Sequence, residues 1–593
     1  MIAKMLKTYV VSRRQQREDL LEALRTLGVM HLAPVDRGQA VAHEETVAAI
    51  DRLRRAQQLL GAVKPAGIKP HDVTTIQAAE EALAIHRAAA ERRNRLGNLH
   101  RQINQLAVWG DVRLEQFAAL REAGVRIGFY SLPARDAGAI QADLVQVVAD
   151  RFGRGVLVAV VQRDGEAKIP DSAEPVELPP RDRHSLRGEA AEVDKELADD
   201  EKRLTELAHF AKDMQEEMNR LTATAQFTIA DRGGLAEGEL YAVQGWIPAD
   251  KAEHLRKGLA AESIDAGVEV FQPQEGDHPP TLIELPRWAR PIQGLMKILG
   301  ISPGYNEQDV SIGFMIALPI FAAMLFSDAG YGLLFTLLPI VFRRKVVAKM
   351  GANVANLIIV IGVISIVWGG LTGSFFGMDV PGMFHGKPLI VVSLDEAAMR
   401  LLMRISFTIG MIHLIVAQLW RAATMLPDLK ALAKVGWAVF LAGMYGLVCK
   451  FVLAAPFDMS TPWPYLMIAG AALVIPFTSP SRNILKTIGL GMANMPLPIL
   501  GTFSDIMSYV RLMAVGLAGS VLASSFNDLA VGAGSILMVP ILIFGHGLNI
   551  GLCLIALFAH GVRLNVLEFS NNFGLEWSGY PYHPFGREQL QEN

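Results

Sequence analysis

From about residue 309 onward the sequence consists of long apolar stretches that charged residues rarely interrupt, and this pattern limits the possible folds most strongly. A helix needs roughly 20 apolar residues to cross the hydrocarbon of a bilayer. By this measure we predict eight spans, at 309–327, 330–342, 354–378, 401–420, 435–455, 463–478, 497–527 and 535–569. The break at 327–330 is compatible with a tight turn or a re-entrant bend. The second half, residues 306–593, is therefore predicted to be an all-α polytopic membrane domain.

The first half, residues 1–305, is rich in charged residues and alanine, with only short apolar runs. Three segments, 7–35, 125–162 and 238–273, have the alternation of a strand, a helix and a strand. We therefore predict small α/β lobes in this half. The N-terminal segment has no secretory signal, so we expect these lobes to lie in the cytoplasm.

Two helical arms are predicted to join these lobes, near 75–120 and 183–226. Apolar or small residues recur there at the alternating spacing of three and four that is typical of a coiled-coil seam, which Asp200 interrupts. The seam residues are Val193, Leu197, Leu204, Leu207, Ala211, Met214, Met218 and Leu221, with matching spacing at Leu96, Leu99, Ile103 and Leu106. An antiparallel coiled-coil arm is one interpretation, and two ordinary amphipathic core helices are the other.

The distribution of basic residues predicts the orientation of the membrane domain, because loops on the cytoplasmic side carry an excess of Lys and Arg. Such residues follow the second, fourth and sixth spans, whereas the loops on the other side offer mainly Lys387. They are Arg343, Arg344, Lys345, Lys349, Arg421, Lys430, Lys434, Arg482 and Lys486. Both termini are thus predicted to be cytoplasmic.

Charge and motifs exclude several classes of function. A net charge of -3 gives no basic field for nucleic acid. The two cysteines, Cys449 and Cys553, lie in apolar stretches, which argues against a disulfide framework or a thiolate metal site. The sequence has no phosphate-binding loop, no G-x-G-x-x-G after a predicted strand and no H-E-x-x-H. We therefore expect no cofactor, no metal and no nucleotide hydrolysis by this chain itself.

Arg511 lies about midway along the seventh predicted span. A cation at that depth costs roughly 2.5 to 3.5 kcal/mol on insertion scales, so it should face protein or water rather than lipid. A guanidinium also stays charged throughout a proton cycle. Ser504 and Ser508 share its face, and Asp505 lies close by in the sequence. Permanent pairing with a membrane carboxylate, Asp505 or Asp328, is the alternative interpretation.

The eighth predicted span carries a polar stripe. At 100° per residue, polar side chains fall within an arc of about 100°, and Asn565 and Glu568 lie beyond them. The stripe consists of His546, Asn549, Cys553, His560 and Arg563. A single membrane histidine can serve as an interhelical hydrogen-bonding group or as a proton relay. Taken together, the residues of the stripe favour the proton relay, and the polar groups at both ends of the span suit two offset aqueous paths.

Several sequence blocks resemble one known family, the a-type subunit (subunit I in prokaryotes) of V-type and archaeal-type rotary ATPases. They are SDIMSYVRLMAVGLAGS, AHGVRLNVLEFSNNFG, GYPYHPF, FSDAGYG and GWIP, and they are spread over the whole chain. The resemblance implies two α/β lobes joined by helical arms, followed by eight transmembrane helices. Arg511 matches the family's essential arginine and Arg563 its second arginine, while His560 and Glu568 also fall on motif positions. Cys553 and Asn565 depart from the Glu and His of some members.

The resemblance implies a stator that forms ion half-channels against a rotor ring and moves H⁺ or Na⁺, coupled to ATP hydrolysis or synthesis elsewhere in the complex. The implied partners are the proteolipid subunits of the rotor ring, peripheral stalk subunits, central stalk subunits and the lipid bilayer. The implied location is the prokaryotic inner membrane. A different class of function is a secondary transporter or channel in which Arg511 and Arg563 bind an anionic solute. Such a protein would move solute when reconstituted alone.

Overall fold

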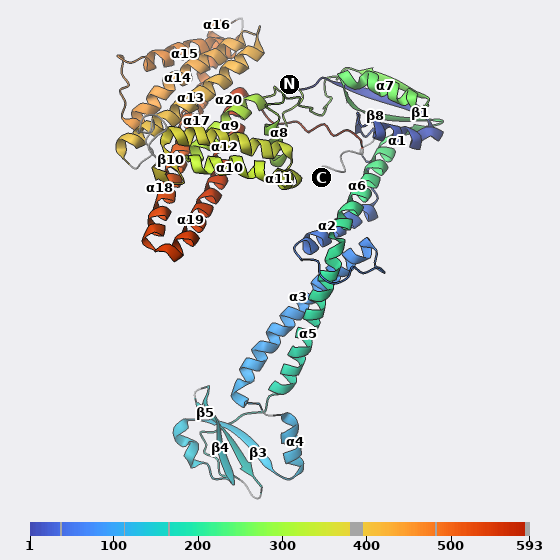
Figure 1. Cartoon of the computed structure of the whole chain (residues 1–593), viewed down its shortest axis with the longest axis vertical. Coiled ribbons are helices and arrows are strands. Elements are labelled where there is room, and N and C mark those ends of the chain that lie inside the picture. The colour runs from blue at the N-terminus through green and yellow to red at the C-terminus, as the bar shows by residue number, and fades with distance from the viewer. Residues whose placement is uncertain are drawn as a thin grey trace.

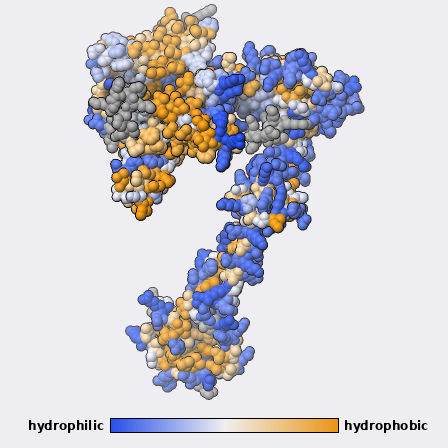
Figure 2. All heavy atoms as spheres, in the orientation of Figure 1, coloured by the Kyte–Doolittle hydropathy of each residue, from blue (hydrophilic) through white to orange (hydrophobic). Residues whose placement is uncertain are grey.

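The computed structural model describes residues 1–35, 38–111, 113–153, 155–163, 167–379, 395–480 and 483–586. Lys387 and Arg482, two of the basic residues used to predict orientation, lie outside these ranges. Figure 1 shows a helical body formed by the second half and an elongated first half that extends away from it. Apolar side chains gather on the surface of the helical body, whereas the first half is mostly hydrophilic (Figure 2). The change in composition near residue 305 thus marks a change in architecture.

The lobe next to the helical body contains a five-stranded antiparallel sheet that unites two distant segments of the sequence. Its central strand β1 pairs with β8 along its full length and with β9 on the other side. The first and third strand–helix–strand segments therefore form one lobe. The elements are β1 (Met5–Arg13), α1 (Arg17–Leu27), β2 (His31–Ala33), β7 (Leu235–Glu237), β8 (Leu240–Pro248), α7 (Ala252–Ala261) and β9 (Ala266–Phe271).

The distant lobe is a four-stranded sheet of order β4-β5-β3-β6, with aromatic side chains packed on it. Its elements are α4 (Leu114–Glu122), β3 (Arg126–Leu132), β4 (Leu144–Phe152), β5 (Gly155–Gln162) and β6 (Glu174–Pro175). Short 3₁₀ turns occur at Arg14–Gln16, Leu106–Trp109, Ala134–Ala139, Ala208–Phe210 and Ala249–Lys251.

Four helices connect the lobes: α2 (Glu44–Gly61), α3 (Thr75–Gln105), α5 (Arg183–Leu207) and α6 (Ala211–Gly233). Near the distant lobe α3 and α5 run side by side (Figure 1), and Leu99 packs with Leu186 in one cluster. Asp200, which interrupts the seam, accepts a 2.6 Å hydrogen bond from Arg92 on α3. Nearer the helical body the seam residues pack against α2 as well as α3, a partner that the spacing did not predict. Supercoiling of this arm stays a prediction.

In the second half each of the eight predicted spans contains an apolar helix, although the helix of the third span ends at Thr372 and the seventh span is divided between two helices. Five helical stretches in the described ranges are long and apolar enough to cross a membrane, and α9, α10 and α15 are shorter. A membrane crossing by those three stays a prediction. The elements are α8 (Pro291–Leu299), α9 (Ser311–Phe326), α10 (Ala329–Val341), α11 (Arg343–Met350), α12 (Ala352–Thr372), β10 (Ser374–Phe375), β11 (Met378–Asp379), α13 (Glu396–Met425), α14 (Lys430–Leu453), α15 (Trp463–Thr478), α16 (Ile484–Ala493), α17 (Pro496–Ser508), α18 (Val510–Gly532), α19 (Ser535–Ala556) and α20 (Ser570–Phe573).

After α20 the chain returns to the nearer lobe and binds along it. The Tyr582 hydroxyl donates to the carbonyl of Val29, and the amide of Phe585 donates to the carbonyl of Met30. The amide of His583 donates to Nδ1 of His31, 3.0 Å away. Burial lowers the pKa of His31 to about 4, which keeps this nitrogen free to accept. The last helix of the body is thereby tied to the N-terminal lobe.

Candidate functional site

Arg511 is the second residue of α18, in a helical segment that the structure divides in two. We predicted one helix over 497–527, whereas α17 ends at Ser508 and α18 begins at Val510, with Tyr509 between them. Nε of Arg511 donates a 2.9 Å hydrogen bond to the carbonyl of Ser508. A second nitrogen, Nη2, donates to Oε1 of Glu568 at 3.0 Å. The arginine is thus held by its own helix on one side and by the last helical segment on the other.

Glu568 reaches this position because the last helical segment is wound as a π-helix. Two π-helical stretches, Leu557–Val562 and Leu564–Phe569, continue α19. At 100° per residue, positions five apart in an α-helix point about 140° apart. A π-helix bonds residues i and i+5, so positions five apart nearly face the same way. Arg563 and Glu568 therefore meet, with 3.5 Å between Nε and Oε1, although the stripe geometry set them apart.

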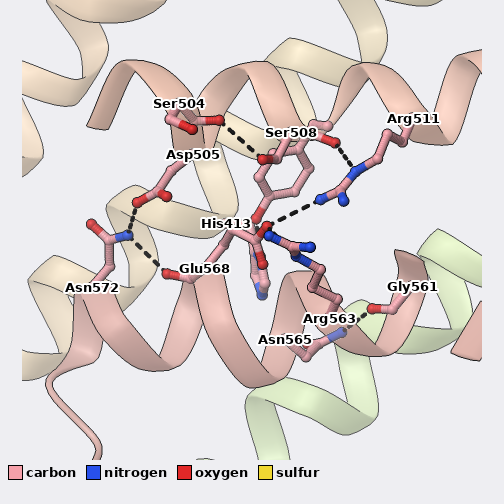
Figure 3. A network of polar contacts seen from close by, with 11 residues as sticks. His413, Ser504, Asp505, Ser508, Arg511, Gly561, Arg563, Asn565, Glu568 and Asn572 are labelled. Carbon is pink, nitrogen blue, oxygen red and sulfur yellow. Dashed lines mark hydrogen bonds and ion pairs between the residues drawn. The ribbon is translucent and has the colours of Figure 1, made fainter. Parts of the chain in front are cut away.

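The side chains of Arg511, Arg563 and Glu568 lie together (Figure 3), and they differ in how far they are exposed. The side chain of Glu568 is 5% exposed, that of Arg511 25% and that of Arg563 53%. Two arginines thus share Oε1 of one carboxylate, while Oε2 is buried without a hydrogen-bond partner among the described residues. The group carries two positive charges against one negative charge, so it can attract a further anion.

Neither of the carboxylates considered as a permanent partner of Arg511 contacts it. Asp505 instead accepts a 2.7 Å hydrogen bond from Asn572, whose amide also donates to the carbonyl of Glu568. Gln418 of α13 donates to the same Asn572 side chain at 3.0 Å. This amide therefore fixes α13, α17 and the end of the last helical segment against one another.

The serines predicted beside Arg511 contact the helix backbone. The Ser508 hydroxyl donates to the carbonyl of Ser504, and the carbonyl of Ser508 orients Arg511. Ser504 itself is exposed. Of the two, Ser508 contributes directly to the geometry of the arginine.

His413, on α13, belongs to this site although no sequence motif identified it. Its Nδ1 lies 2.7 Å from the Tyr509 hydroxyl, and its ring stacks on Phe569, with 4.6 Å between centroids. A lone histidine within the apolar stretch 401–420 was the available signal, but its spacing to Arg511 in the sequence gave no link.

His546 and Asn549 lie in a second polar cluster, together with Tyr331. The Tyr331 hydroxyl is 2.8 Å from Nδ1 of His546 and accepts from the Asn549 amide at 3.0 Å. His546 also contacts Asn527 on α18, at 3.1 Å. At 1.5 Å per residue this cluster lies about 24 Å along α18 from Arg511. The polar stripe therefore separates into two groups.

His560 and Asn565 complete the predicted set. His560 is partly buried, and its Nδ1 has no hydrogen-bond partner within the described ranges. Asn565 is buried, and its amide donates to the carbonyl of Gly561 one turn earlier. The contacts therefore join Arg511, Arg563 and Glu568 most directly and leave His560 at the edge of the group. No group of three or more His, Cys, Asp or Glu residues suited to a metal occurs in the described part of the chain.

The chain is similar along nearly its whole length to known proteins. No protein-family model matches the chain. V-type ATP synthase subunit I of Borreliella burgdorferi is 28% identical, with 99% of each chain covered. V-type ATP synthase subunit I 1 of Treponema pallidum is 27% identical, over 99% of this chain and 100% of the relative. A-type ATP synthase subunit I of Methanocaldococcus jannaschii is 27% identical, over 62% of this chain and 57% of the relative. These relatives confirm the family resemblance found in the sequence.

Among solved structures, the chain matches a crystal structure of the cytoplasmic N-terminal domain of subunit I, a homologue of subunit a of V-ATPase. The match covers 45% of this chain and all of that chain, at 15% identity and a TM-score of 0.19.

Proposed function

Because the chain is homologous along nearly its whole length to V-type ATP synthase subunit I, we propose that it is the membrane stator subunit of a rotary ATPase. In this role it forms two ion half-channels against a rotor ring of proteolipid subunits. Arg511 is the residue that each rotor carboxylate must pass. Nucleotide chemistry belongs to other subunits, and the transported ion is H⁺ or Na⁺.

One observation carries the proposal: two arginines share one oxygen of a single buried carboxylate within the helical body. A fully buried, permanently paired arginine would be a structural cation. Arg511 is a quarter exposed and engages Glu568 through one nitrogen, so part of its charge stays available to a second acid. Glu568 is then the counter-ion that holds Arg511 when no rotor carboxylate is opposite.

The charge chemistry follows from the environment of the rotor acid. In lipid a carboxyl group is neutral, because an isolated charge there costs several kcal/mol. Opposite Arg511 and Arg563 the positive charge favours the ionised form, so the rotor acid releases its ion. An ion crosses only by boarding the ring, being carried around and leaving on the other side, since the fixed positive charge opposes a direct leak.

The two polar clusters supply the offset that this cycle requires. Arg511 and Glu568 lie near the start of α18, and His546 lies beside its far end. Ser504, Ser508, Asp505, His560 and Arg563 accompany the first cluster, and Asn549 accompanies the second. One aqueous path would reach each cluster from its own side of the membrane. With the basic loops on the cytoplasmic side, the chain is a multi-pass protein of the prokaryotic inner membrane with both termini in the cytoplasm.

The first half would hold the stator against torque. Its two lobes and the arm between them give an elongated body (Figure 1), and the C-terminal segment ties this body to the last membrane helix. Peripheral stalk subunits would bind the lobes and the arm, and central stalk subunits would contact other surfaces.

Arg511→Ala in the complete complex tests the proposal. ATP-driven uptake of H⁺ and of Na⁺ into vesicles is measured in complexes with normal subunit composition. We expect a loss of about 100-fold or more, the usual effect of removing a charge that stabilises a reacting group. Arg400→Ala is the matched control, because Arg400 is an exposed arginine of the same domain that also pairs with a glutamate. Full coupled transport by assembled Arg511→Ala complexes would refute the assignment.

A further inference from the structure

We infer that His413 is a positioning residue that sets the geometry of the Arg511–Glu568 pair from α13, through Tyr509 on one side and Phe569 on the other. The inference rests on the proposed function and deepens it, because it assigns to a third helix the placement of the charge that the rotor acid meets. Neither His413 nor Tyr509 needs to bind the ion.

The first step concerns the backbone at Tyr509. In a continuous α-helix the amide of Leu512 would donate to the carbonyl of Ser508. Here it donates to the carbonyl of Tyr509, at 3.1 Å, and the amide of Tyr509 donates to Ile506, also three residues back. The tight turn thus takes the Leu512 amide away from the carbonyl of Ser508, and Nε of Arg511 bonds to that carbonyl instead. The break therefore aims the guanidinium, leaving its outer nitrogens for the carboxylate.

The second step concerns the contacts that hold the break between α17 and α18 in place. The side chain of Tyr509 is fully buried against α13. A Cβ placed on Gly410 would lie 2.5 Å from the tyrosine ring, so the ring fits only because residue 410 is glycine. One turn further along α13, Nδ1 of His413 bonds the tyrosine hydroxyl at 2.7 Å. Ring and hydroxyl are thus both fixed by one face of α13.

The third step links the same histidine to the carboxylate. The ring of His413 stacks on Phe569 with 25° between the planes, and Phe569 directly follows Glu568 in the π-helical stretch. His413 therefore contacts Tyr509, two residues before Arg511, and Phe569, the residue after Glu568. The alternative interpretation is that His413 only fills space in the core. It explains the stacking on Phe569, but it predicts no effect of the Tyr509 hydroxyl on ion transport.

Tyr509→Phe is the sharpest test, because it removes only the hydroxyl that joins α18 to His413. Its matched control is Tyr445→Phe, which removes a hydroxyl that joins α14 to Thr408 on the same α13 at 3.0 Å. In assembled complexes we expect coupled transport to fall about tenfold in Tyr509→Phe, since small displacements of a reacting group can cost up to about 100-fold. Transport by Tyr445→Phe should stay within about twofold of the wild type.

A second variant covers the case in which Tyr509→Phe does not assemble. Gly410→Ala removes no hydrogen-bonding group but pushes on the Tyr509 ring, and alanine is the better helix former. We expect about the same loss of transport, without a weaker helix. Equal transport in Gly410→Ala and the wild type would overturn the inference, as would equal transport in Tyr509→Phe and Tyr445→Phe.

Combination with Glu568→Gln distinguishes positioning from a general loss of structure. If Tyr509 acts by placing Arg511 against Glu568, Tyr509→Phe should add little once the carboxylate is gone, whereas an independent structural defect would add its full effect. Additive losses would therefore overturn the inference. Arg511→Ala is measured in parallel. A loss in Arg511→Ala with none in Tyr509→Phe refutes only the role of His413, whereas transport by Arg511→Ala refutes the proposed function itself.

Discussion

Two buried carboxylates of the helical body, Asp328 and Glu568, are satisfied in opposite ways. Asp328 accepts four hydrogen bonds and is paired with no cation among the described residues. The donors are the amides of Tyr331, Phe376 and Gly377 and the hydroxyl of Ser374, at 2.7 to 3.0 Å. Glu568 has two arginines on one oxygen, and its other oxygen lacks a partner within the described ranges.

Under the proposed function, the difference separates a structural acid, Asp328, from a functional one, Glu568. Asp328 caps α10 and holds the segment that contains β10 and β11, so all of its acceptor capacity is used within the chain. A buried polar group left incompletely bonded costs stability, and such groups cluster where a ligand or a partner completes them. Asp328 and Glu568 are both buried, so burial does not distinguish them. The groups that donate hydrogen bonds to them do.

The largest expected effect is that of Asp328→Asn on stability. An amide nitrogen in place of either oxygen faces two donors instead of accepting from them, which should cost about 2 to 4 kcal/mol. Thermal denaturation of the purified complex measures this loss. Transport per assembled complex should stay near that of the wild type, and a selective loss of transport with normal stability would mean that Asp328 belongs to the ion path.

Glu568→Gln should have the reverse profile. The amide keeps the shape and an acceptor for Arg511, but it removes the negative charge that both arginines share. We expect complexes of normal stability with coupled transport reduced about tenfold, less than the roughly 100-fold loss on complete removal of a stabilising group, because the amide still bonds Arg511. Uptake assays beside denaturation curves measure both quantities. If the curve shifts as far as that of Asp328→Asn, the comparison between the two acids fails.

Tyr331→Phe is the mildest change and sharpens the boundary of the Asp328 cluster. The amide of Tyr331 continues to bond Asp328, while the hydroxyl that contacts His546 and Asn549 is lost. We expect a loss of about 1 kcal/mol in stability, because Asn549 keeps its bond to Gly519. Transport should fall less than in Glu568→Gln. A larger fall in transport than in Glu568→Gln would mean that transport depends more on the cluster of Tyr331, His546 and Asn549 than on Glu568.

The sequence predicted much of the membrane domain. Each apolar stretch proved to be a helix, because a helix in an apolar setting satisfies its own backbone and needs only a run of apolar residues. It also pointed to Arg511 and Glu568 as residues of interest, since a charge within such a run is rare. The meeting of Arg563 with Glu568 was missed, because α-helical periodicity was assumed through a stretch that is π-helical.

The sequence by itself thus determined where the helices lie, which charges they carry and which relatives the chain has, because these follow from local composition and motifs. Only the tertiary structure decided that β1 pairs with β8, that Tyr509 breaks the arginine helix against His413 and that Glu568 rather than Asp505 or Asp328 meets Arg511. Each of these depends on contacts between residues far apart in the chain, and the spacing of residues within one segment carries no information about which distant segment will pack against it.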